Sequence, residues 1–198
     1  MLFGRCHVSR CLVYLCRTPG RLVSRDVAVL SGRSMSTNLP THFPRKAAMQ
    51  ALAAAAKLAR QPVPPSPLLW HGWFDGSATP NPGRIGIGAL LLGPAGERSE
   101  TSRRAGDGSS GDAEYLALIA LLEDAARRGV TELVVYGDSQ VVVHDMLLAA
   151  GAGARGLEHH RAAALALVAV LGNVAVRWVP RHRNGEADRL SQQALDAV

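Results

Sequence analysis

The feature that most constrains the fold of this 198-residue chain is the order of its apolar segments after residue 67. Three short segments come first, and Gly and Pro residues separate them, a spacing that favours an antiparallel meander. Two later strands alternate with helices, which favours parallel additions and therefore an α/β fold with a mixed sheet. The predicted strands cover residues 68–76, 84–93, 97–103, 132–138 and 173–180. The predicted helices cover residues 112–128, 139–150, 157–171 and 185–197, the last one capped by Asn184.

The chain divides into an N-terminal extension and one globular domain. Residues 1–44 are basic and are expected to be a disordered arm, whereas the Ala-rich residues 45–60 predict one helix. Residues 61–67, QPVPPSP, contain four prolines, which forbid helix continuation and predict a stiff linker. We therefore expect a domain boundary at this linker and a single domain over residues 68–198.

The net charge of +6 is unevenly distributed. Residues 1–60 hold ten Lys and Arg and one acid, Asp26, whereas residues 61–198 hold twelve Arg and fifteen acids, a sum of −3. A basic segment favours polyanions because its binding releases condensed counterions. A solvated basic tail accounts for the same composition, and the sequence leaves the two interpretations open. No apolar run approaches the roughly 20 residues that a membrane span requires, so we expect no membrane partner.

All three cysteines, Cys6, Cys11 and Cys16, fall in the N-terminal arm, and their spacing matches no zinc pattern. The domain has none, which indicates a reducing compartment and predicts a cytoplasmic location. Residues 1–34 are rich in Arg and nearly free of acids, a composition that resembles an organelle transit peptide. Translation starting at Met35 is a further alternative. We favour disorder or a misassigned start over targeting.

Four acids lie at the edges of apolar segments, where packing alone does not explain a charge. They are Asp75 in FDGSATPNPG, Glu114 in GDAEYLAL, Asp138 in VVYGDSQ and Asp188 in RHRNGEADRL. Buried carboxylates are costly unless they are paired or bound to metal, and no lysine follows Lys57. A hard divalent cation such as Mg2+, which takes oxygen ligands, is therefore the expected partner. Acidic clusters of this kind most often serve phosphoryl chemistry.

Each of these acids also has a purely structural interpretation. Glu114 suits the helix dipole, but that role does not explain why it falls on the helix face that packs inward. Asp138 follows a strand at the edge where open α/β sheets bind ligands, although it would serve equally as a helix cap. Asp75 fits an Asp-Gly turn, and Asp188 fits an ordinary acidic helix start. The combination therefore indicates function more strongly than any single acid.

The motifs DGSATPNPG, AEYLAL, GDSQ and WVPRHRN-x-x-AD, with a glycine-alternating strand after the first, resemble the type 1 ribonuclease H family. The resemblance covers roughly residues 70–195. It implies a ribonuclease H-like five-stranded mixed sheet flanked by helices, which agrees with the element order given above. It also implies an endoribonuclease that cleaves the RNA strand of RNA–DNA hybrids with two Mg2+ ions, or Mn2+ as a substitute, and leaves 3′-hydroxyl and 5′-phosphate ends. The expected partner is an RNA–DNA hybrid, and the chain is expected to act as a monomer.

The same resemblance implies a role for each acid. Asp75 would bridge both metal ions, and Glu114 and Asp138 would hold the ion beside the attacking water. Asp188 would lie on the leaving-group side. This division suits two ions that clamp the attacking and departing oxygens of an in-line displacement.

His182, on the loop before the last acid, would assist product release or proton transfer by the same resemblance. A surface histidine that contacts phosphate beside Arg181 is an open alternative. Asn81 would face the hybrid backbone and Gln140 would reach the minor groove, where RNA exposes its 2′-hydroxyls. Ser110 stands where many relatives carry asparagine, and its hydroxyl can still donate to a phosphate. The predicted nucleic-acid contacts are Asn81, Ser110, Gln140 and Arg181.

A functional alternative is a non-catalytic nucleic-acid-binding module that retains the fold. The four acids argue against it, because a pure binder has no reason to gather repelling carboxylates near phosphates. Residues 151–161 also lack the basic, Trp-bearing helix with which some relatives grip the hybrid. Within this segment, His159 and His160 beside Glu158 suggest a metal site, but the pattern favours a solvated helix turn.

Overall fold

The computed structural model describes residues 45–148 and 154–196. The expectation of a disordered arm over 1–44 lies outside the described residues. Five strands form one mixed sheet in the order β3-β2-β1-β4-β5. β1, β2 and β3 pair antiparallel, whereas β4 lies parallel to β1 and to β5, which confirms the predicted sheet. The strands are β1 (Leu69–Thr79), β2 (Gly83–Leu92), β3 (Arg98–Gly108), β4 (Glu132–Gly137) and β5 (Asn173–Trp178).

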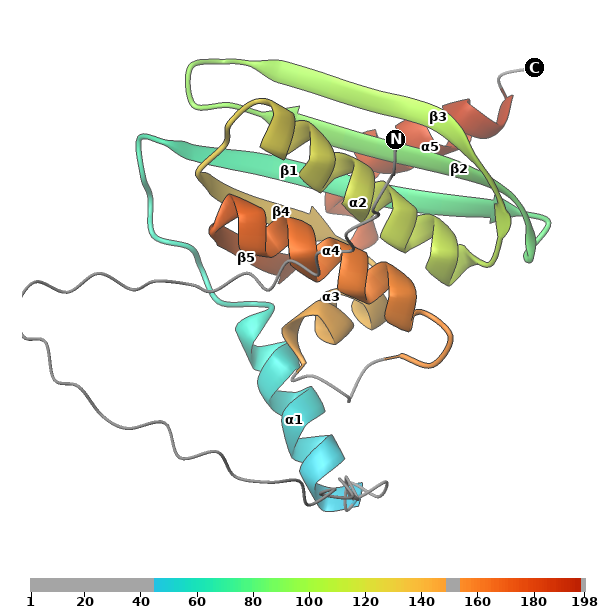
Figure 1. Cartoon of the computed structure of the whole chain (residues 1–198), viewed down its shortest axis with the longest axis horizontal. Coiled ribbons are helices and arrows are strands. Elements are labelled where there is room, and N and C mark those ends of the chain that lie inside the picture. The colour runs from blue at the N-terminus through green and yellow to red at the C-terminus, as the bar shows by residue number, and fades with distance from the viewer. Residues whose placement is uncertain (1–44, 149–153, 197–198) are drawn as a thin grey trace, which may run out of the picture. The chain divides into compact units, whose positions relative to one another are not determined.

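Helices cover both faces of the sheet. Figure 1 shows α2 and α4 in front of the sheet and α5 behind it. The described helices are α1 (Arg45–Leu58), α2 (Ser110–Arg127), α3 (Gln140–Leu147), α4 (Glu158–Leu171) and α5 (Gly185–Asp196), with a 3-10 turn, η1, at Arg181–Arg183.

Three elements, β1, β3 and α2, extend beyond the bounds that the sequence predicted. β1 continues to Thr79 rather than ending at residue 76. β3 continues to Gly108 rather than ending at residue 103, because it pairs with β2 as far as Gly83. α2 begins at Ser110, two residues earlier than expected. Its start is fixed by a capping box, in which the Ser109 hydroxyl accepts from the Asp112 N–H and the Asp112 carboxylate accepts from the Ser109 N–H.

Glycines let two helices pack directly on strand backbones. A Cβ at Gly76 of β1 would lie 2.1 Å from the Ala113 carbonyl carbon of α2. A Cβ at Gly88 of β2 would lie 2.2 Å from the Ala187 carbonyl oxygen of α5. Both distances are too short for any real side chain, so these positions need glycine. The close approach brings the first turns of α2 and α5 to opposite faces of β1.

The core lies between the sheet and α2, whose apolar face is completely buried. Its largest fully buried side chains include Tyr115, Phe74, Ile85, Ile87, Leu118, Leu121 and Leu122. Ile85 and Ile87 of β2 alternate with Gly86 and Gly88, which face α5, as a period of two requires. In the described part of the chain, no helix combines the length and apolar character needed to cross a membrane.

Helix α1 contacts the domain through its C-terminal end. Ala55 and Ala59 are buried, and the Ala59 carbonyl accepts a 3.0 Å hydrogen bond from the Trp178 N–H of β5. The Arg60 guanidinium carbon lies 5.3 Å from the centroid of the Trp178 ring. One residue further, the Gln61 carbonyl accepts from Arg177 Nε at 2.7 Å. The proline-rich segment 61–67 therefore separates two parts of the chain that touch each other.

Candidate metal centre

Three carboxylates from three elements meet at one edge of the sheet. Asp75 belongs to β1, Glu114 lies in the first turns of α2, and Asp138 directly follows β4. One oxygen of each lies within 4.8 Å of the others. The structure therefore brings together three of the four predicted ligands.

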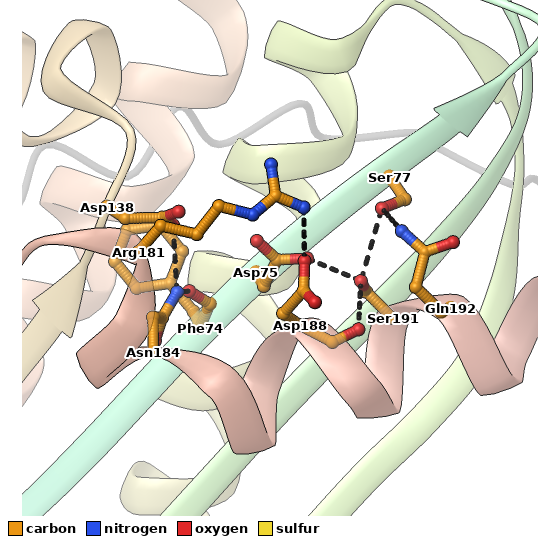
Figure 2. A network of polar contacts seen from close by, with 9 residues as sticks. All are labelled: Phe74, Asp75, Ser77, Asp138, Arg181, Asn184, Asp188, Ser191 and Gln192. Carbon is orange, nitrogen blue, oxygen red and sulfur yellow. Dashed lines mark hydrogen bonds and ion pairs between the residues drawn. The ribbon is translucent and has the colours of Figure 1, made fainter.

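The Asp75 carboxylate is buried, with 5% of the residue exposed. Burial, together with the charges of Asp138 and Asp188, raises its pKa to about 6, although a hydrogen bond from Ser191 opposes the shift. The Ser191 hydroxyl donates that bond to Oδ2 (Figure 2). Like charges and burial both disfavour ionisation, so this carboxylate lacks a cationic partner of sufficient strength.

Glu114 is the least satisfied acid of the group. Burial, followed by the charges of Asp75 and Asp138, raises its pKa well above the usual range, although a backbone hydrogen bond from Gly76 opposes the shift. Its Oε2 atom is buried and has no hydrogen-bond partner among the described residues. An unpaired buried carboxylate oxygen is costly and is uncommon in folded proteins. A bound cation would satisfy it, so the three-oxygen donor set fits a hard divalent metal.

Asp138 is held in place by neighbours from β5 and the following loop. Its carbonyl accepts from Trp178 Nε1 at 3.0 Å, and its Oδ1 accepts from Asn184 Nδ2 at 2.8 Å. The same amide donates to the Phe74 carbonyl at 2.9 Å. The prediction that Asn184 caps α5 with its side chain is wrong, because the side chain turns inward to these two acceptors. Its own Oδ1 has no partner among the described residues, and only its backbone carbonyl accepts from the Asp188 N–H.

Asp188 lies beside the group and not within it. It faces Asp75 from the first turns of α5, as Figure 2 shows, and its charge raises the Asp75 pKa. One of its oxygens accepts from the Arg181 guanidinium at 2.6 Å. Arg181 is largely exposed, and its positive charge also lowers the pKa of Asp75 and Glu114. In this arrangement the arginine is the main counter-ion for the acids.

Three polar residues that sequence reasoning missed support the site. The Ser191 hydroxyl lies 2.9 Å from the Asp188 carbonyl oxygen and 3.2 Å from the Ser77 hydroxyl. Gln192 Nε2 in turn donates to the Ser77 hydroxyl at 2.6 Å. Their spacing in the sequence could have identified two of them. Ser191 lies three residues after Asp188 on a helix, and Ser77 lies two residues after Asp75 on a strand. These residues therefore share a face with the acids they support.

The remaining predicted residues surround the acids at greater exposure. Asn81 and Ser110 contact each other at the start of α2, where Asn81 Oδ1 accepts from the Ser110 N–H at 3.0 Å. Gln140 is the exposed first residue of α3, two residues after Asp138. His182 is exposed in η1 and lines a cavity of about 450 Å3 together with Trp73 and the start of α5. It is not among the grouped metal-ligand atoms of the described residues.

Comparisons with known proteins found similar chains. A model of the reverse transcriptase-like family matches residues 73–194. Ribonuclease HI of Halobacterium salinarum is 35% identical over 127 residues, and the match spans 64% of this chain and 64% of that relative. The crystal structure of RNase H1 from this archaeon has a TM-score of 0.60 at 34% identity, covering 66% of this chain and 99% of that one. LC11-RNase H1 in complex with an RNA/DNA hybrid has a TM-score of 0.59 at 29% identity, covering 64% of this chain and 96% of that one.

Proposed function

The chain belongs to the reverse transcriptase-like family, as its ribonuclease H-like motifs indicated, and we propose that it is a divalent-metal-dependent endoribonuclease acting on RNA–DNA hybrids. The observation that carries this proposal is the grouping of Asp75, Glu114 and Asp138 around an unpaired buried oxygen. A relative named Ribonuclease HI and a similar structure that holds an RNA/DNA hybrid support the choice of substrate.

Each acid has a distinct proposed role in holding two Mg2+ ions, or Mn2+ in their place. Asp75 would bridge both, Glu114 and Asp138 would hold the ion beside the attacking water, and Asp188 would face the leaving group. The ions would activate the water and stabilise charge on the departing oxygen, giving 3′-hydroxyl and 5′-phosphate ends. Ser191 fixes the bridging carboxylate through its hydrogen bond to Asp75.

Arg181 would have a different partner in each state of the site. Its guanidinium pairs with Asp188 at 2.6 Å in the structure. Divalent cations would neutralise the same carboxylates and repel the guanidinium. Because Arg181 is exposed and long, it can then turn to a substrate phosphate, for which a planar guanidinium is well suited. This exchange would couple metal loading to phosphate binding.

The proposed hybrid-binding surface lies around the acids. Asn81, from the loop between β1 and β2, forms a polar pair with Ser110, which begins α2 four residues before Glu114. Gln140, next to Asp138, would contact the minor groove, where the 2′-hydroxyl distinguishes RNA from DNA. His182 would assist proton transfer or product release only if its exposed loop turns towards the acids.

A cleavage assay with matched RNA–DNA, RNA–RNA and DNA–DNA duplexes tests the proposal. The full chain should cut only the RNA strand of the hybrid, and only with Mg2+ or Mn2+. EDTA should stop the reaction, and the new ends should be a 3′-hydroxyl and a 5′-phosphate. Tight hybrid binding without cleavage in either metal would instead establish the non-catalytic module.

A further inference from the structure

A second group of metal-ligand atoms lies apart from the three grouped carboxylates. Asp112, His159 and His160 each place one ligand atom within 4.8 Å of the others. Asp112 comes from the first turn of α2 and the two histidines come from the first turn of α4. The proposed function uses none of these side chains. The sequence favoured a solvated turn here, but the fold adds a carboxylate that the sequence pattern did not include.

The separation between the His160 and Asp112 ligand atoms is close to that of two ligands on a metal of the zinc class. Ligands about 2.0–2.2 Å from a tetrahedral ion lie about 3.3 Å from each other. The observed separation between His160 Nε2 and Asp112 Oδ1 is 3.1 Å. The rings of His159 and His160 have centroids 3.8 Å apart, although adjacent helical residues normally diverge. Both imidazoles therefore reach the same carboxylate.

Neighbouring groups hold two of the three ligands in position. The Ser109 N–H and hydroxyl donate to Asp112 Oδ2 at 2.9 and 2.7 Å, which leaves Oδ1 directed towards His160. The His160 ring stacks on Tyr115, and the Tyr115 hydroxyl donates to Asp145. Such outer contacts orient ligands before a metal arrives. His159 is exposed, so the group has an open side for ion entry and for water.

We propose that Asp112, His159 and His160 bind one transition-metal ion of the zinc class, with water completing its coordination. Two imidazoles and one carboxylate suit Zn2+, Co2+ or Ni2+, whereas the all-oxygen group of Asp75, Glu114 and Asp138 suits Mg2+. The ion would tie the first turn of α4 to the first turn of α2. It would replace the hydrogen bond between His160 and Asp112 with two coordination bonds.

Metal binding by the full chain tests this site without any measurement of cleavage. The protein would carry Asp75→Asn to weaken the other centre, and Cys6→Ser, Cys11→Ser and Cys16→Ser because thiolates are themselves Zn2+ ligands. It would be freed of metal with EDTA and would then be titrated with Zn2+ against a chromophoric chelator. We expect one tight equivalent of Zn2+. His159→Ala, which removes an exposed side chain, should weaken this binding at least about tenfold. His144→Ala, a histidine of α3 outside the group, is the matched control and should bind as the parent does.

Co2+ gives a second measurement on the same variants. Bound to two imidazoles and a carboxylate in a four-coordinate site, it should give visible absorption that His159→Ala and His160→Gln abolish and His144→Ala retains. Circular dichroism would show that the variants keep their fold. Absence of tight Zn2+ binding by the parent, or equal binding by folded His159→Ala, would overturn the proposal. Either result would leave the proposed hybrid cleavage untouched, because the two sites share no ligand.

Discussion

Among the described residues, two of the places that bury carboxylates treat them in opposite ways. Asp145 of α3 is 2% exposed and has partners on every side: the Tyr115 hydroxyl, the Ala154 N–H at 2.9 Å and the Arg161 guanidinium at 3.6 Å. Asp75 is similarly buried, at 5%, but its nearest charges include further acids. Burial alone therefore does not mark a functional acid; the missing partner does.

This difference indicates that the two sets of acids contribute to different properties of the protein. The Asp145 cluster joins α2, α3 and α4 through one fully paired acid, so its contribution is to stability. The grouped carboxylates of Asp75, Glu114 and Asp138 oppose folding until a cation arrives, so their contribution is to function. Substitutions at the two places should consequently change different measured quantities.

The largest expected effect is the loss of cleavage in Asp75→Asn. Removal of the proposed bridging charge should lower kcat roughly 1,000-fold, the equivalent of about 4 kcal/mol, while the fold is kept. Steady-state cleavage of an RNA–DNA hybrid measures it. Asp196→Asn, at the far end of α5, is the matched control and should cleave normally. Near-normal turnover by folded Asp75→Asn would end the metal-bridging role.

The next effect concerns stability at the paired acid. Asp145→Ala should lower the free energy of unfolding by about 2–3 kcal/mol, because it removes the buried acceptor of the Tyr115 hydroxyl and of the Ala154 N–H. Urea denaturation measures this change. A decrease in the free energy of unfolding of less than about 1 kcal/mol would contradict this, because it would show that Asp145 contributes little to stability.

Added Mg2+ should stabilise the protein only when the grouped carboxylates are intact. Mg2+ at about 100 times its dissociation constant should raise the free energy of unfolding of the wild-type protein by about 2.7 kcal/mol. Asp75→Asn should gain far less, because it lacks a ligand. Thermal unfolding with and without Mg2+ measures both. An equal shift for the two proteins would place the stabilising ion elsewhere.

The smallest effect is a gain in stability. Because burial raises the Asp75 pKa to about 6, its ionisation opposes folding. The penalty is absent below the unfolded-state pKa near 4, grows as the pH rises to about 6 and is constant above that. In EDTA at pH 7, the free energy of unfolding of Asp75→Asn should therefore be about 2 kcal/mol higher than that of the wild type. The two values should converge near pH 4. A gap that is independent of pH would show that ionisation is not its cause.

The sheet could be predicted from the sequence because it follows from periodicity and from the order of the strands. The grouping of the acids was implied by the resemblance to ribonuclease H, and one of the four acids expected there, Asp188, lies beside the group. Sequence reasoning missed what depends on side-chain direction. The sequence predicted that Asn184 caps α5, but its side-chain amide turns inward and donates to the Phe74 carbonyl and to Asp138. The local sequence around Asp145 carries no sign of its ion pair with Arg161, which lies sixteen residues away on another helix.

Helix α1 was also predicted in isolation, without its packing. Its alanines offer little apolar area, so the sequence gives no reason to expect a buried face. The same small side chains allow close approach, and Ala55 and Ala59 are buried in the structure. Contacts of this kind depend on the surface that receives the helix and have no local signature.

The junction of α1 with β5 bears on self-association. β5 ends the sheet, and edge strands offer unpaired N–H and carbonyl groups to other molecules. The Ala59 carbonyl already accepts the Trp178 N–H, and the Gln61 carbonyl accepts Arg177. Four of the seven residues of 61–67 are prolines, which have no N–H to donate, so this segment is a poor partner for a further strand. A protein shortened to residue 68 would lose this cover and expose β5 to aggregation.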